Sequence, residues 1–208
     1  GRSGDTWDAD RVQGCSCSLP VSDRRGQPTN YVCSEFACPA GDDPLTTSGT
    51  EPEVQRVNCT ATAGYFRLAF RNRYTRAIFW NAAASGSSGS VESRLEELPS
   101  IDDVTVSFSS GSSACSSDGV SMRITFSTEF GDVPLLSAAA NELTGPGTLT
   151  FEEVVTGNKE SSECSARGLC NRRFGLCSCF KGFTSSDGSG GQGTRNDCGA
   201  VQVYDVPS

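Results

Sequence analysis

Five cysteines form one run near the end of the chain with the spacing C-x5-C-x6-C-x-C-x18-C: Cys164, Cys170, Cys177, Cys179 and Cys198. The run is interspersed with glycines and has almost no apolar core residues, so hydrophobic burial alone cannot hold it together. Disulfide bonds take over that role in small domains that fold in oxidising compartments, whereas thiols in the reduced cytosol stay unpaired. The run therefore predicts a disulfide-stapled module in an extracellular protein.

The rest of the composition argues against several classes of function. The 208 residues include no histidine and no two C-x2-C elements at finger spacing, so we expect disulfides and no zinc site. Without histidine there is no Ser-His or Cys-His nucleophile pair, and the carboxylates show no paired arrangement, so we expect neither catalysis nor a cofactor. A net charge of −8 argues against a nucleic-acid partner. Because no apolar run is long enough, we expect no membrane span in this segment.

Two acidic stretches could contribute to a cation site, but turn chemistry accounts for both. Asp42 and Asp43 precede a proline, and Glu129–Pro134 contains Gly131 and Asp132. Calcium prefers several hard oxygen ligands, and neither stretch supplies a bidentate ligand at loop spacing. We therefore expect no metal.

A glycine-rich run, residues 187–193, superficially suggests a phosphate-binding loop. It lacks the Lys-Ser/Thr pair that follows such loops, and it lies between two cysteines that we expect to be bonded. We expect a slack disulfide loop.

The middle of the chain predicts a separate domain, because residues 60–163 hold a single cysteine, Cys115, and show period-two apolar patterns. Such alternation is typical of half-buried antiparallel strands, which we expect near residues 66–70, 104–108, 122–126 and 148–152. A short helix is predicted after Ser90, a suitable cap, with Val91, Leu95 and Leu98 on one face and Pro99 ending it. The predicted fold class is mostly β with one short helix: a small α+β or β-sandwich-like domain flanked by disulfide-rich modules.

The cysteine run resembles an EGF-like module, because its C-x-C element is followed by an aromatic-glycine turn and a distant last cysteine. Cys15, Cys17 and Cys33 echo the second half of that layout at an offset of 162 residues, which suggests a longer parent chain with repeats. We therefore predict four parts. They are the C-terminal half of an EGF-like module at 1–37, the middle domain at 38–157, an EGF-like module at 158–199 and a tail or linker at 200–208.

Together with the cysteine run, three stretches resemble the repeat-containing extracellular proteins of heterokont algae and oomycetes. They are Cys38-Pro-Ala-Gly-Asp-Asp-Pro-Leu-Thr46, Gly64-Tyr-Phe-Arg-Leu-Ala-Phe70 with Arg94-Leu-Glu-Glu-Leu-Pro-Ser-Ile101, and Thr125-Phe-Ser-Thr-Glu-Phe-Gly-Asp-Val-Pro-Leu-Leu136. That group includes proteins of the mastigonemes, the tubular hairs of flagella. The resemblance implies a structural segment of an extracellular filament, at the cell surface or in a flagellar hair. Its partners would be copies of itself or neighbouring repeats.

The resemblance also implies a disulfide pattern, since EGF-like modules pair the first cysteine with the third, the second with the fourth and the fifth with the sixth. The expected bridges are Cys164–Cys177, Cys179–Cys198, Cys17–Cys33, Cys38–Cys59 and Cys115–Cys170. The last of these would fix the angle between the middle domain and the module. Cys15 is left over and is expected to be unpaired or bonded outside these residues.

Two further features concern partners. Asn58 begins an Asn-Cys-Thr sequon, which predicts an attached glycan in an exported protein. Four arginines form a basic segment that is either a solvated strand face or an assembly contact with an acidic segment of a neighbouring copy, such as Asp42–Asp43 or Asp102–Asp103. These arginines are Arg67, Arg71, Arg73 and Arg76.

The alternative function is cell-surface adhesion, in which the middle domain recognises a glycan or a partner protein. A binding domain of that kind should expose aromatic side chains close together. Tyr74, Phe79 and Trp80 are the candidates, although the same residues could belong to the core.

Overall fold

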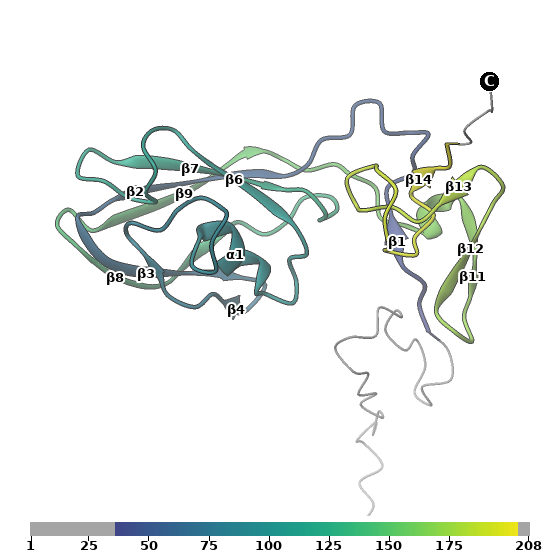
Figure 1. Ribbon diagram of the computed structural model, residues 1–208, viewed down its shortest axis with the longest axis horizontal. Helices are drawn as coiled ribbons and strands as arrows, with labels where there is room; N and C mark the ends of the chain where they lie inside the picture. Colours follow the sequence, from purple (N-terminus) through teal and green to yellow (C-terminus); the bar gives the residue numbers. More distant parts are fainter. Residues whose placement is uncertain (1–35, 204–208) are drawn as a thin grey trace, which may run out of the picture.

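The computed structural model describes residues 36–203 and contains two lobes (Figure 1). One lobe, residues 51–157, is a β-sandwich with a short helix. The other is the cysteine-rich module, formed by residues 36–43 together with 158–203. The described chain is thus mostly β, as predicted. It enters and leaves through the cysteine-rich module, with the sandwich between.

Two antiparallel sheets make up the sandwich. The first has the order β6 (Val104–Phe108), β7 (Val120–Phe126), β2 (Val54–Thr60) and β9 (Thr148–Val155). In the second, β3 (Ala63–Phe70) lies between β8 (Ser137–Thr144) and the short strands β4 (Arg73–Tyr74) and β5 (Ile78–Phe79). The period-two patterns correctly predicted strands β3, β6, β7 and β9.

The core lies between these sheets, where the alternating apolar side chains of β2, β3 and β7 meet. Phe70 and Phe126 stack across it with ring centroids 5.4 Å apart. Helix α1 (Val91–Glu96) covers one side, with Val91 and Leu95 fully buried. Ser90 accepts a hydrogen bond from the backbone N–H of Ser93 at 3.2 Å, so the predicted N-cap is confirmed.

Strands β2 and β8 were not predicted, and each breaks the simple alternation for its own reason. In β2 a bulge between Val54 and Gln55 buries both side chains. Gln55 is fully buried because its amide oxygen accepts from Leu136 N at 2.8 Å, while its amide nitrogen donates to Pro134 O at 3.2 Å. Strand β8, with the sequence Ser-Ala-Ala-Ala-Asn-Glu-Leu-Thr, is mostly exposed and therefore carries no apolar period.

The cysteine-rich module consists of three two-stranded ladders and one tight turn. The ladders are β1 (Ala40–Gly41) with β10 (Ser162–Glu163), β11 (Gly168–Asn171) with β12 (Leu176–Cys179), and β13 (Phe183–Thr184) with β14 (Ala200–Val201). The boundary expected at residue 38 is therefore wrong, because β1 pairs with β10 and residues 36–43 belong to this module. Residues 200–201 also belong to it, since they form β14.

Some predictions lie outside the described residues. These are the half-module at 1–37 except for its last two residues, the Cys17–Cys33 bridge and the partner of Cys15. Within residues 36–203, no helix is long and apolar enough to cross a membrane.

Candidate functional site: the disulfide core and the junction between the lobes

Four disulfides lie within the described residues, and two of them are the expected ones: Cys164–Cys177 and Cys179–Cys198. The expected Cys38–Cys59 and Cys115–Cys170 bridges are wrong. The partners are exchanged, and the structure contains Cys38–Cys170 and Cys59–Cys115.

Strand pairing explains the exchange. Cys38 comes just before β1. Because β1 pairs with β10, the Cα atom of Cys38 lies 5.6 Å from the Cα atom of Cys170. Cys59 lies near the end of β2, where Ala61 N donates to Ser116 O at 3.0 Å and draws the 115–116 segment alongside. Cys115 is thus fully buried in the sandwich core, with its Cα atom 4.9 Å from that of Cys59.

The module contains six bonded cysteines, in chain order Cys38, Cys164, Cys170, Cys177, Cys179 and Cys198. The first is bonded to the third, the second to the fourth and the fifth to the sixth, which is the order that the resemblance implies. The whole sandwich is inserted between the first and the second cysteine. Sequence reasoning missed this insertion because 125 residues separate Cys38 from the run that completes its module.

A covalent path therefore bypasses the sandwich. It passes from Cys38 through its disulfide to Cys170, along the backbone to Cys179, and through the second disulfide to Cys198. Only residues 170–179 of the backbone lie on this path. Tension applied at the two ends of the module would be borne by these bonds, without loading the β-strands of the sandwich.

Sulfur atoms and a buried ion pair stabilise the centre of the module in place of an apolar core. Cys38, Cys164 and Cys198 are its buried centre. Next to them the guanidinium of Arg167 donates to the buried carboxylate of Asp43 in a two-pronged contact, with 2.7 Å from Nε to Oδ1 and 2.6 Å from Nη2 to Oδ2. These hydrogen bonds lower the pKa of Asp43 below its ordinary value, despite the opposing effect of burial.

A left-handed turn, η1 (Cys164–Ala166), lies beside this ion pair. All three residues have φ between 50° and 55°, a conformation that costs a non-glycine residue about 1–2 kcal/mol. The Cys164–Cys177 bridge ties the turn to β12. We infer that the disulfides compensate for this local strain.

The two connecting segments between the lobes run side by side and are hydrogen-bonded to each other. Asn158 N donates to Glu51 O at 3.1 Å, and Glu51 N donates to the Asn158 side-chain oxygen at 2.6 Å. Glu160 N donates to the Asp42 carboxylate at 3.0 Å. Of the two acids expected in a turn here, Asp42 thus links the connectors and Asp43 anchors Arg167.

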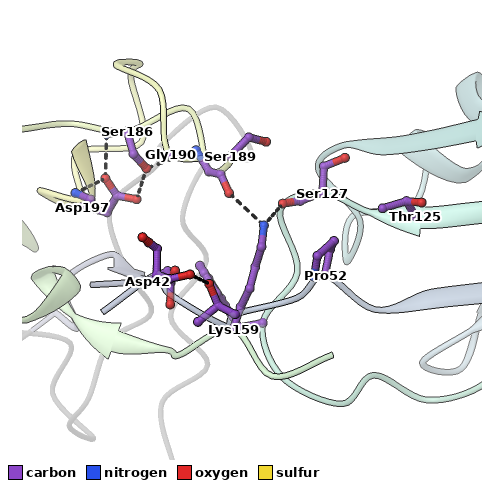
Figure 2. Close-up of a pocket in the computed structure, with 14 residues that line it drawn as sticks. Asp42, Pro52, Thr125, Ser127, Lys159, Ser186, Ser189, Gly190 and Asp197 are labelled. Carbon is purple, nitrogen blue, oxygen red and sulfur yellow. Dashed lines mark hydrogen bonds between the residues drawn. The ribbon is translucent and has the colours of Figure 1, made fainter. Parts of the chain in front are cut away.

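Lys159 lies at the centre of the junction and bonds both lobes (Figure 2). Its ammonium donates to Ser127 O of the sandwich at 2.5 Å and to Gly188 O of the cysteine-rich module at 3.5 Å. Burial lowers the pKa of Lys159 below its ordinary value. The stem of Lys159 lines a cleft of about 400 Å³ between the lobes, whose walls include Phe130 on one side and Asp197 on the other.

Arg195 makes a second connection across the junction. Its guanidinium contacts Asp102 of the sandwich at 3.0 Å and lies 5.7 Å from the ring centroid of Phe130. Within its own module it lies 3.7 Å from Asp197, a buried carboxylate that accepts from Ser186 N at 2.8 Å. The interaction therefore holds the 186–197 loop against the sandwich.

This loop is not slack, contrary to expectation. Asp187 organises its tip by accepting from Ser189 N at 2.7 Å and Gly191 N at 3.0 Å. Gly188 has φ +90°, and a Cβ atom there would meet Thr128 Cγ2 of the sandwich at 2.9 Å. The glycine thus permits close contact between the lobes.

Three carboxylates also converge next to the junction: Glu53, Asp132 and Glu153. Glu53 is buried, and its two oxygens accept hydrogen bonds from Gly157 N at 2.7 Å and from the Gln55 amide at 3.1 Å. Its role in the structure is therefore to hold the start of the second connector. Oxygen donors of this kind could hold a hard cation, but the buried member already has protein partners.

The four arginines of the basic segment differ in their contacts: two pair with carboxylates and two do not within the described chain. Arg71 pairs with Glu129 at 3.1 Å, and Arg76 lies 3.6 Å from Glu97. Arg67 and Arg73 have no carboxylate partner within residues 36–203. Of the acids suggested as partners on another copy, Asp43 binds Arg167 and Asp102 binds Arg195 within the chain.

The sequon asparagine, Asn58, lies on the outer side of β2, a central strand of the first sheet. Its amide nitrogen donates to Thr150 Oγ1 at 3.1 Å, and its amide oxygen accepts from Ser121 Oγ at 2.5 Å. A glycan at this position would be attached to the same amide nitrogen that donates to Thr150. Glycosylation of Asn58 stays a prediction.

Neither the models of known protein families nor the curated protein sequences give a match to this chain. The four disulfides fit a protein that folds in an oxidising, extracellular environment.

Proposed function

We propose that the chain is a structural segment of an extracellular fibre, in which the cysteine-rich module bears tension and the sandwich is attached at its side. The observation that carries this proposal is the Cys38–Cys170 bridge. It spans a sequence separation of 132 residues and joins the entrance of the module directly to its cysteine run. If the sandwich were the part that extends under load, a covalent path around it would prevent that extension.

The junction supports the same function. Hydrogen bonds between the connectors, the Lys159 contacts and the Arg195 contacts join the lobes at three separate places. A laterally attached domain that is held at several points keeps a fixed orientation to the module. Regular spacing of side domains along a fibre follows if such segments repeat.

One edge of the sandwich gives a further reason to assign assembly to the module. The outer edge of β6 has backbone N–H groups that do not pair with a strand, and such groups can pair with a strand of another molecule when they are exposed. Glu92 and Glu96 of helix α1 accept from two of them, with 3.2 Å to Val106 N and 3.4 Å to Val104 N. Helix α1 thus covers this edge of the first sheet, so β6 is poorly suited to pair with a strand of another molecule.

The resemblance to the surface proteins of heterokonts directs the proposal toward a flagellar hair or a related surface fibre. A matching arrangement of cysteines also supports EGF-like modules in tandem. No catalytic role is proposed.

Electron microscopy of the protein isolated from its native surface without reduction tests this function. Antibody fragments against the sandwich mark its position. We expect labels at regular intervals along fibres, set to one side of the fibre axis. Labels spread over a membrane surface, with no fibres in the preparation, would contradict the proposal.

The second candidate function, binding at a cell surface, is favoured by one observation. Tyr74 is 64% exposed and Phe79 57% exposed. Trp80, by contrast, is half-buried and packs against the core. Two of the three aromatic candidates therefore face solvent.

A further inference from the structure

The hairpin formed by β11 and β12 exposes large apolar side chains on its outer side. Cys170 pairs with Cys177 in this ladder, and both pack against the buried sulfur centre of the module. Side chains alternate along a strand, so Leu169 and Leu176, which are next to these cysteines in the chain, point to the other side. Leu169 is 66% exposed and Leu176 is 46% exposed.

Two aromatic rings extend this surface. Phe174 lies in the turn at the tip of the hairpin and is 48% exposed. Phe180 follows β12 and is 46% exposed, and its N–H donates to Arg167 O at 2.8 Å, which continues the ladder on the same outer side. Apolar side chains gathered in this way mark a contact surface more often than single ones do. We call the surface formed by Leu169, Phe174, Leu176 and Phe180 the hairpin patch.

The sandwich of the same chain does not reach the hairpin patch. The hairpin lies on the side of the module that faces away from the sandwich (Figure 1). Lys159 and Arg195 hold the facing side of the module against the sandwich. A protein surface that covers the hairpin patch therefore belongs to another molecule.

The charge around the hairpin patch is positive. Residues 164–186 contain no acidic side chain and four cationic ones: Arg167, Arg172, Arg173 and Lys181. The first two bind carboxylates within the chain. The other two are exposed and have no carboxylate partner within residues 36–203. Arg173 adjoins the patch, with its guanidinium carbon 5.5 Å from the ring centroid of Phe174. Two copies of the patch would repel each other, so an acidic partner surface fits better.

The sandwich of a second copy offers such a surface. Residues 51–157 contain thirteen carboxylates and seven arginines. The carboxylates of Glu53, Asp132 and Glu153 lie within 4.8 Å of one another, and the latter two are exposed. These three form no ion pair with a cation of residues 36–203. Leu135, three positions after Asp132, is 46% exposed. We call Asp132, Leu135 and Glu153 the acidic patch.

We propose that the hairpin patch of one copy docks on the acidic patch of a second copy, with Arg173 bonded to Asp132 or Glu153 and the apolar side chains packed on Leu135. Apolar burial supplies affinity, and the charges determine which surfaces meet. The two patches are different parts of the chain, so the contact is head-to-tail and open-ended. The inference rests on the fibre function and names the surfaces through which copies join.

Sedimentation of the unreduced chain over a range of concentrations at low salt tests the proposal. We expect the mean mass to rise with concentration beyond that of a dimer, because the contact is open-ended, and to fall as salt is added. Leu169→Thr should weaken association roughly tenfold, as expected for one buried leucine side chain. Arg173→Glu and Asp132→Arg should each weaken it at least as much, because each reverses a charge at the contact.

The double variant Arg173→Glu with Asp132→Arg identifies the two surfaces directly. In this chain the reversed charges face each other between copies, so we expect it to associate more tightly than either single variant. Two control variants match the changes elsewhere: Arg123→Glu on the outer side of the first sheet, and Phe79→Thr at a ring that is 57% exposed. Both should associate as the unchanged chain does, and near-ultraviolet circular dichroism checks that all variants are folded.

The outcomes separate this contact from the function on which it rests. A chain that stays monomeric at every concentration, or one whose association is unchanged by Leu169→Thr, would overturn the proposal. Association that both single variants lose and the double variant does not regain would refute the acidic patch as the partner surface. The fibre is tested independently by microscopy of the native material. Labelled fibres built from a chain that fails these tests would refute the contact and leave the function intact.

Discussion

Removal of the Cys38–Cys170 bridge, by the double substitution Cys38→Ser and Cys170→Ser, should destabilise one lobe and spare the other. The sandwich has its own apolar core and its own disulfide, Cys59–Cys115, so it does not need the bridge to stay folded. The cysteine-rich module has only a sulfur-centred core, and it would lose one of three bonds.

The magnitude depends on how much chain the bridge closes when the module unfolds. For the full separation of 132 residues, the loop-entropy relation gives about 5 kcal/mol. If the sandwich stays folded, only residues 39–50 and 158–169 form flexible loop. For such a loop of roughly 24 residues the same relation gives about 3.5 kcal/mol. We predict the smaller value, because the lobes have separate cores.

Native-state hydrogen exchange measures both lobes in one experiment. Amides of β11 and β12 should lose roughly 400-fold in protection, the equivalent of 3.5 kcal/mol, or lose protection completely if the module unfolds. Amides of β2, β3 and β7 should change little. Equal losses in both lobes would refute independent folding, and unchanged protection in β11 and β12 would refute the role assigned to the bridge.

Three further predictions concern the junction and the ion pair. Lys159→Met keeps the stem but leaves Ser127 O without its donor, so we expect a loss of about 1–3 kcal/mol in the free energy of unfolding, together with a broader distribution of lobe distances in small-angle scattering. Gly157→Ala should reduce stability in urea titrations, because a Cβ atom there would meet the carbonyl of Gly131 and lie 2.9 Å from Glu53 N. The pKa of Asp43 is lowered by the Arg167 hydrogen bonds, so this stabilisation is present above about pH 3.9 and is lost as the pH falls through the folded-state pKa. Asp43→Asn should remove that part of the acid dependence, which is measured as melting temperature between pH 2 and pH 6.

The strands and the helix that the sequence predicted are those in which burial follows a regular period. Phe66, Leu68 and Phe70 alternate cleanly because β3 has one side on the core, and Ser90 with Pro99 brackets the helix. Strand β2 was not predicted because a polar residue, Gln55, occupies a buried position where an apolar side chain is expected. Its side chain hydrogen-bonds to the 133–136 backbone. A search for apolar periodicity does not detect a buried polar residue of this kind.

The disulfide pairing was only half predictable for a related reason. The sequence contains the order of the cysteines but not which strands lie side by side. Cys38 was expected to begin the middle domain and to bond to the next cysteine, Cys59, whereas the β1–β10 ladder places it in the module. The junction was not predicted either. Nothing in the sequence indicates that Lys159, one of two lysines, donates hydrogen bonds to carbonyls of two distant segments.

Single-molecule stretching of the unreduced chain, held at its two ends, tests the central claim most directly. Because the covalent path between Cys38 and Cys198 contains only residues 170–179, this part can lengthen by no more than about 30 Å before bonds break. After reduction the 159 residues between the same cysteines become extensible, and unfolding should release up to ~550 Å. Long unfolding steps that appear only after reduction are the predicted result. Steps of several hundred ångströms in the unreduced chain would show that the sandwich bears the load, and would contradict the account.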